Sequence, residues 1–423
     1  MSARDALGDA LGDALGGAVD LGQLALGALV LGPALDRLAA RRPGLRDSLR
    51  HEPHGARGET FVAQASLAAK AAFLAKILGT DGARFRPRPA PRPPVDAGGS
   101  ADELLVTGDL LFPGALGPDT LSAALRARLA RAGAVVVNLE GTLGDDPQEL
   151  APLQTARGLG QLLSYAHDAA SPGWASRLGA DGLGALLAGL PPAVLSVANN
   201  HTLDDGEDGF ERTVTRARAL GAVVGDARRD HGGAVVAVGA HRAGLVALSY
   251  GHNRHPRSPQ HLAFDRVPYA LDRARVAAIA DDLRGRGATH LVALLHWGHE
   301  HEHEPTPEQR DCVAALHAAG FAAVVGHHPH LLQTSWVAGG RAAFYSLGDF
   351  IGGDRTVWSR LGALASLRLL AGGRVEAALV PLAQTPYWRP ARTMLLAEAP
   401  ALERAAFDAF FRWKHRSPEP EAA

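Results

Sequence analysis

Cysteine is almost absent from this chain, because only Cys312 occurs among 423 residues. A disulfide framework and a Cys-rich zinc or iron–sulfur site are therefore excluded. An excess of positive charge is missing too, since 43 Lys and Arg stand against 44 Asp and Glu, for a formal net charge of -1. Proteins that bind nucleic acid or anionic lipid present a basic face, so we expect neither as a partner.

Long hydrophobic runs are also lacking. The most apolar stretch near the start, residues 21–35, contains Gln23, several glycines and Pro33. It is shorter than the roughly 20 residues that a membrane-spanning helix needs. Acidic residues such as Asp9 and Asp13 precede it, where a signal peptide would carry positive charge. We therefore expect no transmembrane span, no signal peptide and a cytoplasmic protein.

Hydrophobic residues and histidine are plentiful by contrast. The chain is 47% hydrophobic and 21% charged, a composition typical of a globular protein. Its length fits two or three domains at about 150 residues each, or one large α/β domain with appendages. There are 19 histidines, so any bound metal would be held by imidazole and carboxylate.

Four segments of the chain differ in pattern. A four-residue leucine repeat over residues 7–15 and an apolar stretch at 61–78 predict helices without any cluster that could do chemistry. These helices could pack against the rest of the chain or form a homo-oligomer. Alternating prolines and arginines then predict an extended linker. We expect a helical N-terminal appendage (1–84), a Pro/Arg-rich linker (85–100), an α/β domain (101–395), and a C-terminal helix and tail (396–423).

Short apolar runs alternate with amphipathic stretches from residue 103 onward. The expected strands are 104–110, 134–139, 193–198, 234–238, 244–250, 290–296, 321–326 and 341–347. The expected helices are 119–132, 209–220, 269–286, 306–319 and 401–415. This alternation predicts a layered α/β domain with a largely central sheet.

Metal-binding residue types follow the predicted strands at the point where each ends. Five successive strand ends carry them: Asp109; Glu140; Asn199, Asn200 and His201; His296; and His327, His328 and His330. Functional groups of open α/β sheets gather past the carboxyl ends of the strands, and strand formation itself requires none of these residues there. Carboxylates suit hard divalent ions, and borderline ions add imidazole. The pattern therefore predicts a metal site, and a bridging carboxylate could hold two ions about 3.5–4 Å apart.

Six motifs occur in order between residues 103 and 385. They are GDLLF at Gly108, NLEGTL at Asn138, ANNHTLDDGEDG at Ala198, HWGHEH at His296, GHHPHLLQ at Gly326 and YSLGDF at Tyr345. In these motifs the chain resembles the bacterial CapA family, the poly-γ-glutamate capsule-synthesis proteins, which have a calcineurin-like metallophosphoesterase fold. The resemblance implies a layered metallophosphoesterase-like α/β sandwich.

The resemblance also implies a role for each matching residue. The implied metal ligands are Asp109, Glu140, Asn200, His296, His328 and His330. They would hold divalent ions, two in number, of Mn, Fe, Zn or Mg. His201 matches the catalytic histidine that reaches the substrate, while Asp204 and Glu300 match supporting or substrate-binding positions. His327 falls on a variable position and is left out of the ligand set.

Two positions depart from the family pattern. Metallophosphoesterases begin D-x-H, but Leu111 stands here in place of that histidine, which leaves one ion short of a ligand. Either one of His252, His299, His301 and His303 compensates, or that site is weak or empty. Asp349 replaces the asparagine of SLGNF, and an added carboxylate there could bind a cation or perturb a neighbour.

Two loops carry further polar residues. His252 and Asn253 follow a predicted strand and are candidates for substrate contact. For the residues from His301 to His303, a solvated polar loop is the preferred interpretation over an accessory metal or substrate loop, because His-rich tracts are often only compositional.

Three functions remain open from the sequence. The first is a metal-dependent enzyme with hydrolase-type chemistry on a phosphoester or a γ-glutamyl or amide substrate. The second is a capsule-assembly protein that binds anionic poly-γ-glutamate without turning it over. The third is a repurposed cytoplasmic enzyme that makes or breaks an amide bond. All three take an anionic small molecule or polymer as substrate or partner.

Overall fold

A computed structural model describes residues 98–111, 115–145, 176–226, 228, 232–250, 273–352, 356–385 and 391–413. The predicted N-terminal appendage, with its proposed oligomer contacts, and residues 85–97 of the linker lie outside this part. So do His252 and Asn253.

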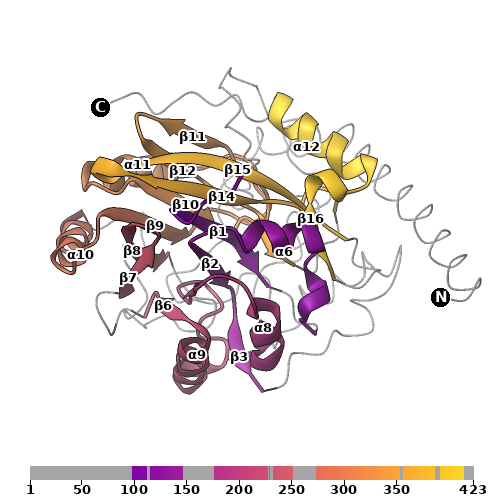
Figure 1. Cartoon of the computed structure of the whole chain (residues 1–423), viewed down its shortest axis with the longest axis horizontal. Coiled ribbons are helices and arrows are strands. Elements are labelled where there is room, and N and C mark those ends of the chain that lie inside the picture. Colours follow the sequence, from indigo (N-terminus) through magenta and orange to yellow (C-terminus); the bar gives the residue numbers. More distant parts are fainter. Residues whose placement is uncertain are drawn as a thin grey trace, which may run out of the picture.

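Two β-sheets form the centre of the described structure, where the sequence pattern had predicted one (Figure 1). The first sheet runs in the order β16-β15-β14-β1-β2-β5-β6, with β13 also paired to β1. Its strands are β1 (Glu103–Leu110), β2 (Ala134–Leu139), β5 (Ala193–Ser196), β6 (Ala222–Val224), β13 (Asp349–Ile351), β14 (Leu361–Leu370), β15 (Arg374–Gln384) and β16 (Thr393–Leu395).

The second sheet runs in the order β11-β12-β10-β9-β8-β7. Its strands are β7 (Gly233–Val238), β8 (His241–Ser249), β9 (His290–His296), β10 (Ala323–His327), β11 (Ser335–Ala338) and β12 (Arg341–Phe344). A separate short pair joins β3 (Thr142–Gly144) to β4 (Arg177–Gly179).

Alternation along the strands explains the layering. On β1, Leu104 and Val106 lie in the same buried cluster as Leu245 and Val292 of the second sheet. Leu105, between them in sequence, belongs to another cluster on the opposite face. Since successive side chains of a strand point to opposite faces, each sheet buries one face against the other sheet and one against helices.

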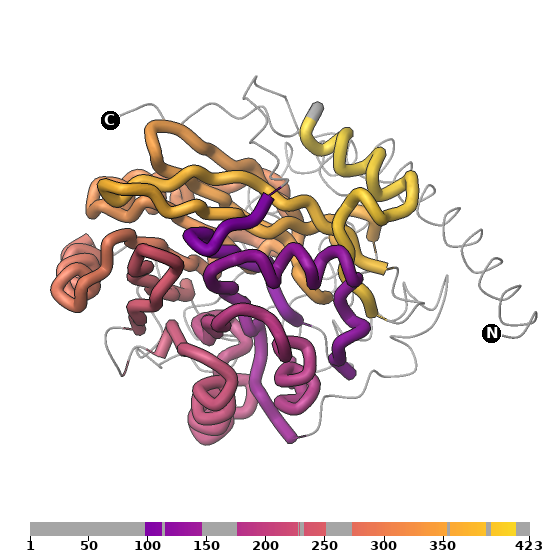
Figure 2. Tube along the Cα trace, in the orientation of Figure 1, coloured from indigo at the N-terminus to yellow at the C-terminus, as the bar shows by residue number. Residues whose placement is uncertain are grey.

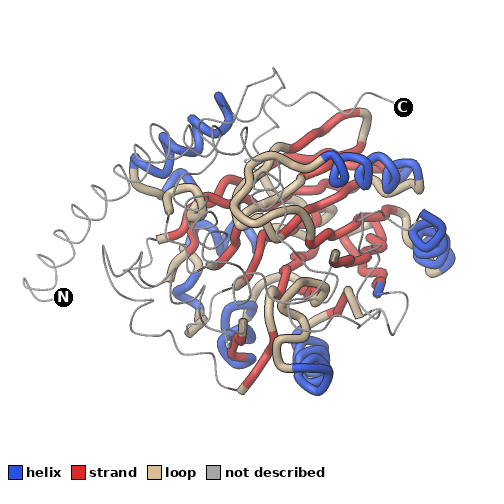
Figure 3. The backbone as a smooth tube through the Cα atoms, turned by 180° about the vertical axis from the view of Figure 1, so that it is seen from behind, coloured by secondary structure: helices blue, strands red, loops and turns tan. Residues whose placement is uncertain are grey.

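Helices cover the two outer faces (Figure 3). The first sheet is covered by α6 (Ala123–Leu129), α8 (Ala180–Leu187) and α9 (Gly206–Leu220), whose apolar residues share its outer cluster. The second sheet is covered by α10 (Arg273–Gly285) and α11 (Pro307–Ala318). The result is an α/β/β/α sandwich, which confirms the layered α/β class that the family resemblance implied.

Strands from the last part of the described chain pair with its first strand. β14 pairs antiparallel with β1, and β13 pairs parallel with it, so late strands lie beside the first one (Figure 2). The final helix, α12 (Ala401–Trp413), buries Phe407 and Phe410 in the cluster between the sheets. We therefore treat α12 as part of the same packed unit rather than as a separate tail.

Most expected elements occur with shifted ends, and β9 has the bounds predicted from sequence. The helix expected at 119–132 is shorter, because α6 begins only after Ser122, whose hydroxyl accepts a hydrogen bond from Leu125 N. The strands β13 to β16 were not predicted at all. Within the described residues, no helix is both long and apolar enough to cross a membrane.

Candidate metal centre

The carboxyl ends of the parallel strands of both sheets bring the predicted ligands together. Asp109 lies near the end of β1, and Glu140 directly follows β2. From the second sheet, His296 ends β9, and His328 and His330 follow β10. Asn200 joins the cluster through its side-chain oxygen, 2.8 Å from Nε2 of His296. All six residues are buried.

Glu140 lies at the centre of this cluster. Its carboxylate is fully buried, and neither oxygen accepts a hydrogen bond from any residue that the structure describes. Three imidazoles surround it instead, since Oε1 lies 3.5 Å from Nε2 of His296, 3.7 Å from Nε2 of His330 and 4.0 Å from Nε2 of His201. A buried carboxylate without donors is costly unless a cation satisfies it. The residues present therefore fit a metal.

Two groups of ligand atoms share Glu140. One contains Asp109, Glu140 and His330, and the other contains Glu140, His296 and His328. Within each group the ligand atoms lie within 4.8 Å of one another. A third group joins Glu300 to His328 and His330. Glu140 is thus the one carboxylate common to two of these three groups among the described residues.

Asp109 holds the loop that carries the two histidines. Its Oδ1 accepts a hydrogen bond from Nδ2 of Asn138 at 2.7 Å, and its Oδ2 accepts one from the backbone N–H of His328 at 2.8 Å. His328 and His330 have φ angles of +97° and +54°, a conformation that non-glycine residues rarely adopt. Burial, followed by repulsion from Glu140, raises the pKa of Asp109 to about 7. Burial likewise raises the pKa of Glu140, although the nearby imidazoles act to lower it.

Asp349, the residue that departs from the family pattern, orients His330. Its Oδ1 lies 2.8 Å from Nδ1 of His330, and this leaves Nε2 facing Glu140. Asp349 is in place because β13 pairs with β1 in a register that sets it beside Asp109. Burial opposes the charge of His330, but Glu140 and Asp349 outweigh it and raise the pKa of His330 well above its usual range.

Asn200 and His201 lie in a turn rather than on extended backbone. β5 already ends at Ser196, and residues 200–205 form turns before α9. The turn is fixed by Asn199, whose Oδ1 accepts a hydrogen bond from His201 N at 3.0 Å and whose Nδ2 donates to Leu139 O at 2.7 Å. This turn gives the two side chains different partners, His296 for Asn200 and Asp204 for His201.

His201 pairs with the predicted supporting residue Asp204. Its Nδ1 lies 2.7 Å from Oδ2 of Asp204, and its Nε2 faces Glu140. Burial lowers the pKa of the imidazole, but the Asp204 carboxylate more than offsets this, so that the pKa of His201 is raised. A buried His–Asp pair with one ring nitrogen aimed at the cluster is suited to hold and release a proton.

His327 is placed away from the ligand groups. Its Nε2 lies 2.9 Å from the carbonyl oxygen of Thr107 on β1, and burial lowers its pKa. This side chain joins the second sheet to the first and is absent from all three groups of candidate ligands among the described residues. Its exclusion from the predicted ligand set agrees with this position.

The histidine-rich loop is not solvated throughout. His303 is 2% exposed, with Nδ1 2.8 Å from Leu332 O and its ring packed against Trp358 and Phe410. The solvated-loop expectation is wrong for this residue, because α12 covers it. Within the described residues, none of His299, His301 and His303 enters a candidate ligand group, whereas Glu300 of the same loop does.

Sequence reasoning missed two residues of the site. Asn138 bonds Asp109, and its Nδ2 lies 3.4 Å from Nδ1 of His296. Tyr250 places its hydroxyl 2.8 Å from Nε2 of His328. Both lie at strand ends, so the rule that found the ligands also applies to them.

Comparison with known proteins identifies the family. Residues 98–354 match the family described as bacterial capsule synthesis protein PGA_cap. The PGA biosynthesis protein CapA of Bacillus subtilis (strain 168) is 32% identical over 127 residues, which are 29% of this chain and 33% of that protein. The capsule biosynthesis protein CapA of Bacillus anthracis is 29% identical over 200 residues, which are 45% of this chain and 47% of that protein.

The matches therefore span about a third to a half of the length of these curated relatives. Among solved structures, the Termus thermophilus sulfate thiohydrolase SoxB in complex with glycerol aligns at 16% identity with a TM-score of 0.36, over 75% of this chain and 61% of that chain. Since the family match covers well over half of the sequence, this chain belongs to the bacterial capsule synthesis protein PGA_cap family.

Proposed function

We propose that this chain is a metal-dependent enzyme whose centre would hold two divalent ions, with Glu140 as the carboxylate that both ligand groups share. The observation that carries the proposal is the Glu140 carboxylate, which is fully buried, accepts no hydrogen bond within the described residues and has three imidazole nitrogens within 4.0 Å. Asp109 and His330 would complete one ion's protein ligands, and His296 and His328 the other's, with Asn200 beside His296.

The mixed ligand set favours borderline ions such as Mn, Fe or Zn over Mg, because imidazole suits them better than it suits a hard ion. When bound, such ions would lower the pKa of water and stabilise the negative charge that develops on the oxygens of a phosphoryl or carbonyl group. The substrate class that fits this chemistry is an anionic phosphoester or a γ-glutamyl or other amide.

His201 is the residue that we propose moves a proton. Asp204 fixes the ring through Nδ1, so Nε2 is the atom that faces the cluster. The raised pKa keeps a larger fraction of the imidazole protonated near neutral pH, as a general acid requires. The proposed role is protonation of the leaving oxygen or nitrogen of the substrate.

The test compares two histidine variants for bound metal and for turnover. His201→Ala should keep metal near the wild-type stoichiometry but lose about a hundredfold or more in turnover, because general acid help is worth about 10²–10⁴. His328→Ala should lose both. His241→Ala, a matched change on the second sheet away from the candidate ligand groups, should alter neither.

Metal content by mass spectrometry and hydrolysis of a generic phosphodiester and a γ-glutamyl anilide would be measured on each purified variant. Equal metal loss in the His201 and His328 variants would make His201 a ligand rather than an acid. Unchanged turnover in His201→Ala would remove it from the mechanism.

A second candidate function is binding of poly-γ-glutamate without turnover, in capsule assembly. The relatives named for PGA and capsule biosynthesis favour it. This function predicts metal-dependent retention of the polymer with no hydrolysis of either substrate. A third candidate, an enzyme that makes or breaks an amide bond, would act on the γ-glutamyl compound alone.

A further inference from the structure

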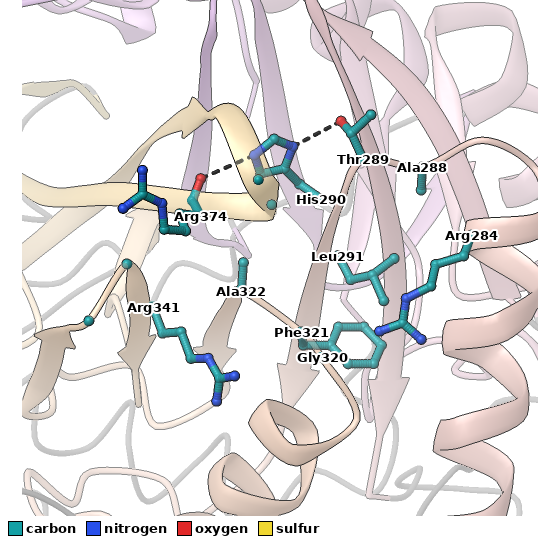
Figure 4. Close-up of a pocket in the computed structure, with 14 residues that line it drawn as sticks. Arg284, Ala288, Thr289, His290, Leu291, Gly320, Phe321, Ala322, Arg341 and Arg374 are labelled. Atoms are coloured by element: carbon teal, nitrogen blue, oxygen red, sulfur yellow. Dashed lines mark hydrogen bonds between the residues drawn. The ribbon is translucent and has the colours of Figure 1, made fainter.

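A polar hollow lies at one edge of the second sheet, and the metal centre lies at the opposite edge. Its volume is about 340 Å³, and it is formed where β9, β10 and β12 begin (Figure 4). β9 passes from His290 at this hollow to His296 at the metal centre, which is about 20 Å at the rise of an extended strand. The hollow is therefore not a part of the candidate metal site.

Three arginines from three different elements line this hollow. Arg284 comes from α10, Arg341 from the start of β12 and Arg374 from the start of β15 (Figure 4). The lining includes neither aspartate nor glutamate. Arg284 has an ion pair with Asp281, which lies outside the lining, so the lining itself makes a local positive potential on a chain of nearly zero net charge.

Two of these arginines keep their hydrogen-bonding capacity for a ligand. Within the described residues, the side chains of Arg341 and Arg374 have neither a hydrogen bond nor an ion pair. Arg284 is partly engaged, because Nη2 donates to Ala319 O at 2.8 Å and Nη1 lies 3.3 Å from Asp281 Oδ1. Guanidinium groups recognise carboxylate and phosphate through paired N–H donors.

Glycines seat the arginine side chains against the backbone. A Cβ atom on Gly320 would displace Nη2 of Arg284, which is the end of a flexible side chain. A Cβ atom on Gly340 would lie 2.9–3.1 Å from Cβ, Cγ and Cδ of Arg374, closer than ordinary contact allows. Because both positions also have positive φ, glycine meets two requirements there at once.

His290 fixes the floor of the hollow and the strand that carries Arg374. Its Nε2 lies 2.7 Å from Leu370 O and 3.1 Å from Arg374 O, and its Nδ1 lies 2.9 Å from Thr289 Oγ1. With Nε2 as the donor, the neutral ring bonds the two carbonyl oxygens, while the Thr289 hydroxyl also donates to Arg242 O at 3.1 Å and accepts from Arg242 N at 3.0 Å. The start of β15 is thereby tied to the start of β9 before any ligand binds.

We propose that this hollow, which we call the arginine pocket (Arg284, Arg341 and Arg374), is a binding site for a compact anion with more than one acidic oxygen, either a phosphate group or a small polycarboxylate. The volume lies at the lower end of the range of about 300–1,000 Å³ for ligand sites, so it admits one such group rather than a large molecule. The pocket is independent of the metal chemistry proposed above.

Titration calorimetry on the full chain tests this assignment with two probes. Inorganic phosphate represents one source of the anion, and tricarballylate represents the other. We expect saturable binding of at least one probe that weakens with added salt, since the contacts are ionic. The double variant Arg341→Ala/Arg374→Ala should weaken it tenfold or more, and the Arg341→Lys/Arg374→Lys variant should lose less. His328→Ala should retain it, which separates this pocket from the metal centre.

The matched control is Arg212→Ala, which removes one exposed positive charge from α9 on the other sheet. It should leave affinity unchanged. Binding of phosphate alone or of tricarballylate alone would support the pocket and identify the source. Failure of both probes to bind saturably, or an equal loss in Arg212→Ala, would overturn the proposal, as would binding that disappears in His328→Ala but not in the arginine variants.

Discussion

Replacing Glu140 by glutamine should stabilise the metal-free protein while abolishing its response to metal. In the structure this carboxylate is fully buried and accepts no hydrogen bond among the described residues. An unsatisfied buried polar group costs about 1–3 kcal/mol, and more when it is charged. Glutamine has nearly the same shape and no charge, and without the Glu140 charge the buried His330 can lose its proton, so the free energy of unfolding without metal should rise by about 1–3 kcal/mol.

When metal is added, wild type should become more stable than Glu140→Gln. A ligand present at 100 times its Kd stabilises the folded state by about 2.7 kcal/mol, and wild type should gain this amount. Glu140→Gln should gain almost nothing, because the carboxylate shared by both ligand groups is gone. Urea unfolding followed by circular dichroism, in EDTA and in excess Mn²⁺, measures both quantities.

Glu403→Gln is the matched control for this experiment. Glu403 is also buried, but its Oε1 accepts a hydrogen bond from Nη2 of Arg360 at 2.9 Å. Removing one partner of a buried pair is destabilising by about 3–5 kcal/mol, so this variant should lose stability with or without metal. A Glu140→Gln protein that is less stable than wild type in EDTA, or one that keeps the full metal response, would refute the reasoning.

Three further predictions follow from other parts of the structure. Asp349→Asn should weaken metal affinity about 10–100-fold, because the carboxylate that orients His330 is lost; unchanged affinity by competitive chelator titration would contradict this. Phe407→Ala should lower the free energy of unfolding by about 3–5 kcal/mol, and a small loss would mean that α12 is not part of the packed unit. Burial lowers the pKa of His317, although its hydrogen bond to Phe321 O acts to raise it. The unfolded chain therefore binds a proton at this histidine more readily than the folded chain does. Stability should therefore fall as the pH drops below about 6.5, with a smaller fall in His317→Gln; equal falls would show that His317 is not responsible.

Much of the site could be predicted because its residues belong to short local motifs. Glu140 and His296 follow or end strongly apolar strands, and their positions past those strands already place them at one edge of a sheet. The role of Asp349 could not be found in this way. It depends on β13 pairing in parallel with β1, across a separation of 240 positions, and nothing local to either strand specifies that register.

The strand pattern did not predict the division into two sheets or the late strands, for a related reason. β14 and β15 form a long antiparallel pair, joined through Gly372 and Gly373 at positive φ, in a region whose small residues give a weak strand signal. Whether apolar strands form one sheet or two depends on which partners they find. Burial on both faces of β1, where Leu104 and Leu105 contact different clusters, is compatible with either arrangement when read from sequence.

Because the site lies between the two sheets, it can form only after both sheets have been synthesised. Asp109, Glu140 and Asn200 are made early in synthesis, whereas His296, His328, His330 and finally Asp349 are made late. About 200 residues separate Glu140 from Asp349, so at about 5–20 residues per second the early carboxylates precede their partner by roughly 10–40 s. Because the two groups that share Glu140 draw on both sheets, a nascent chain that ends before the second sheet cannot present either of these two groups. The protein would therefore select among the ions of the cell only when it is complete. At that stage the packed sheets, rather than a flexible chain, set the spacing that an ion must fit.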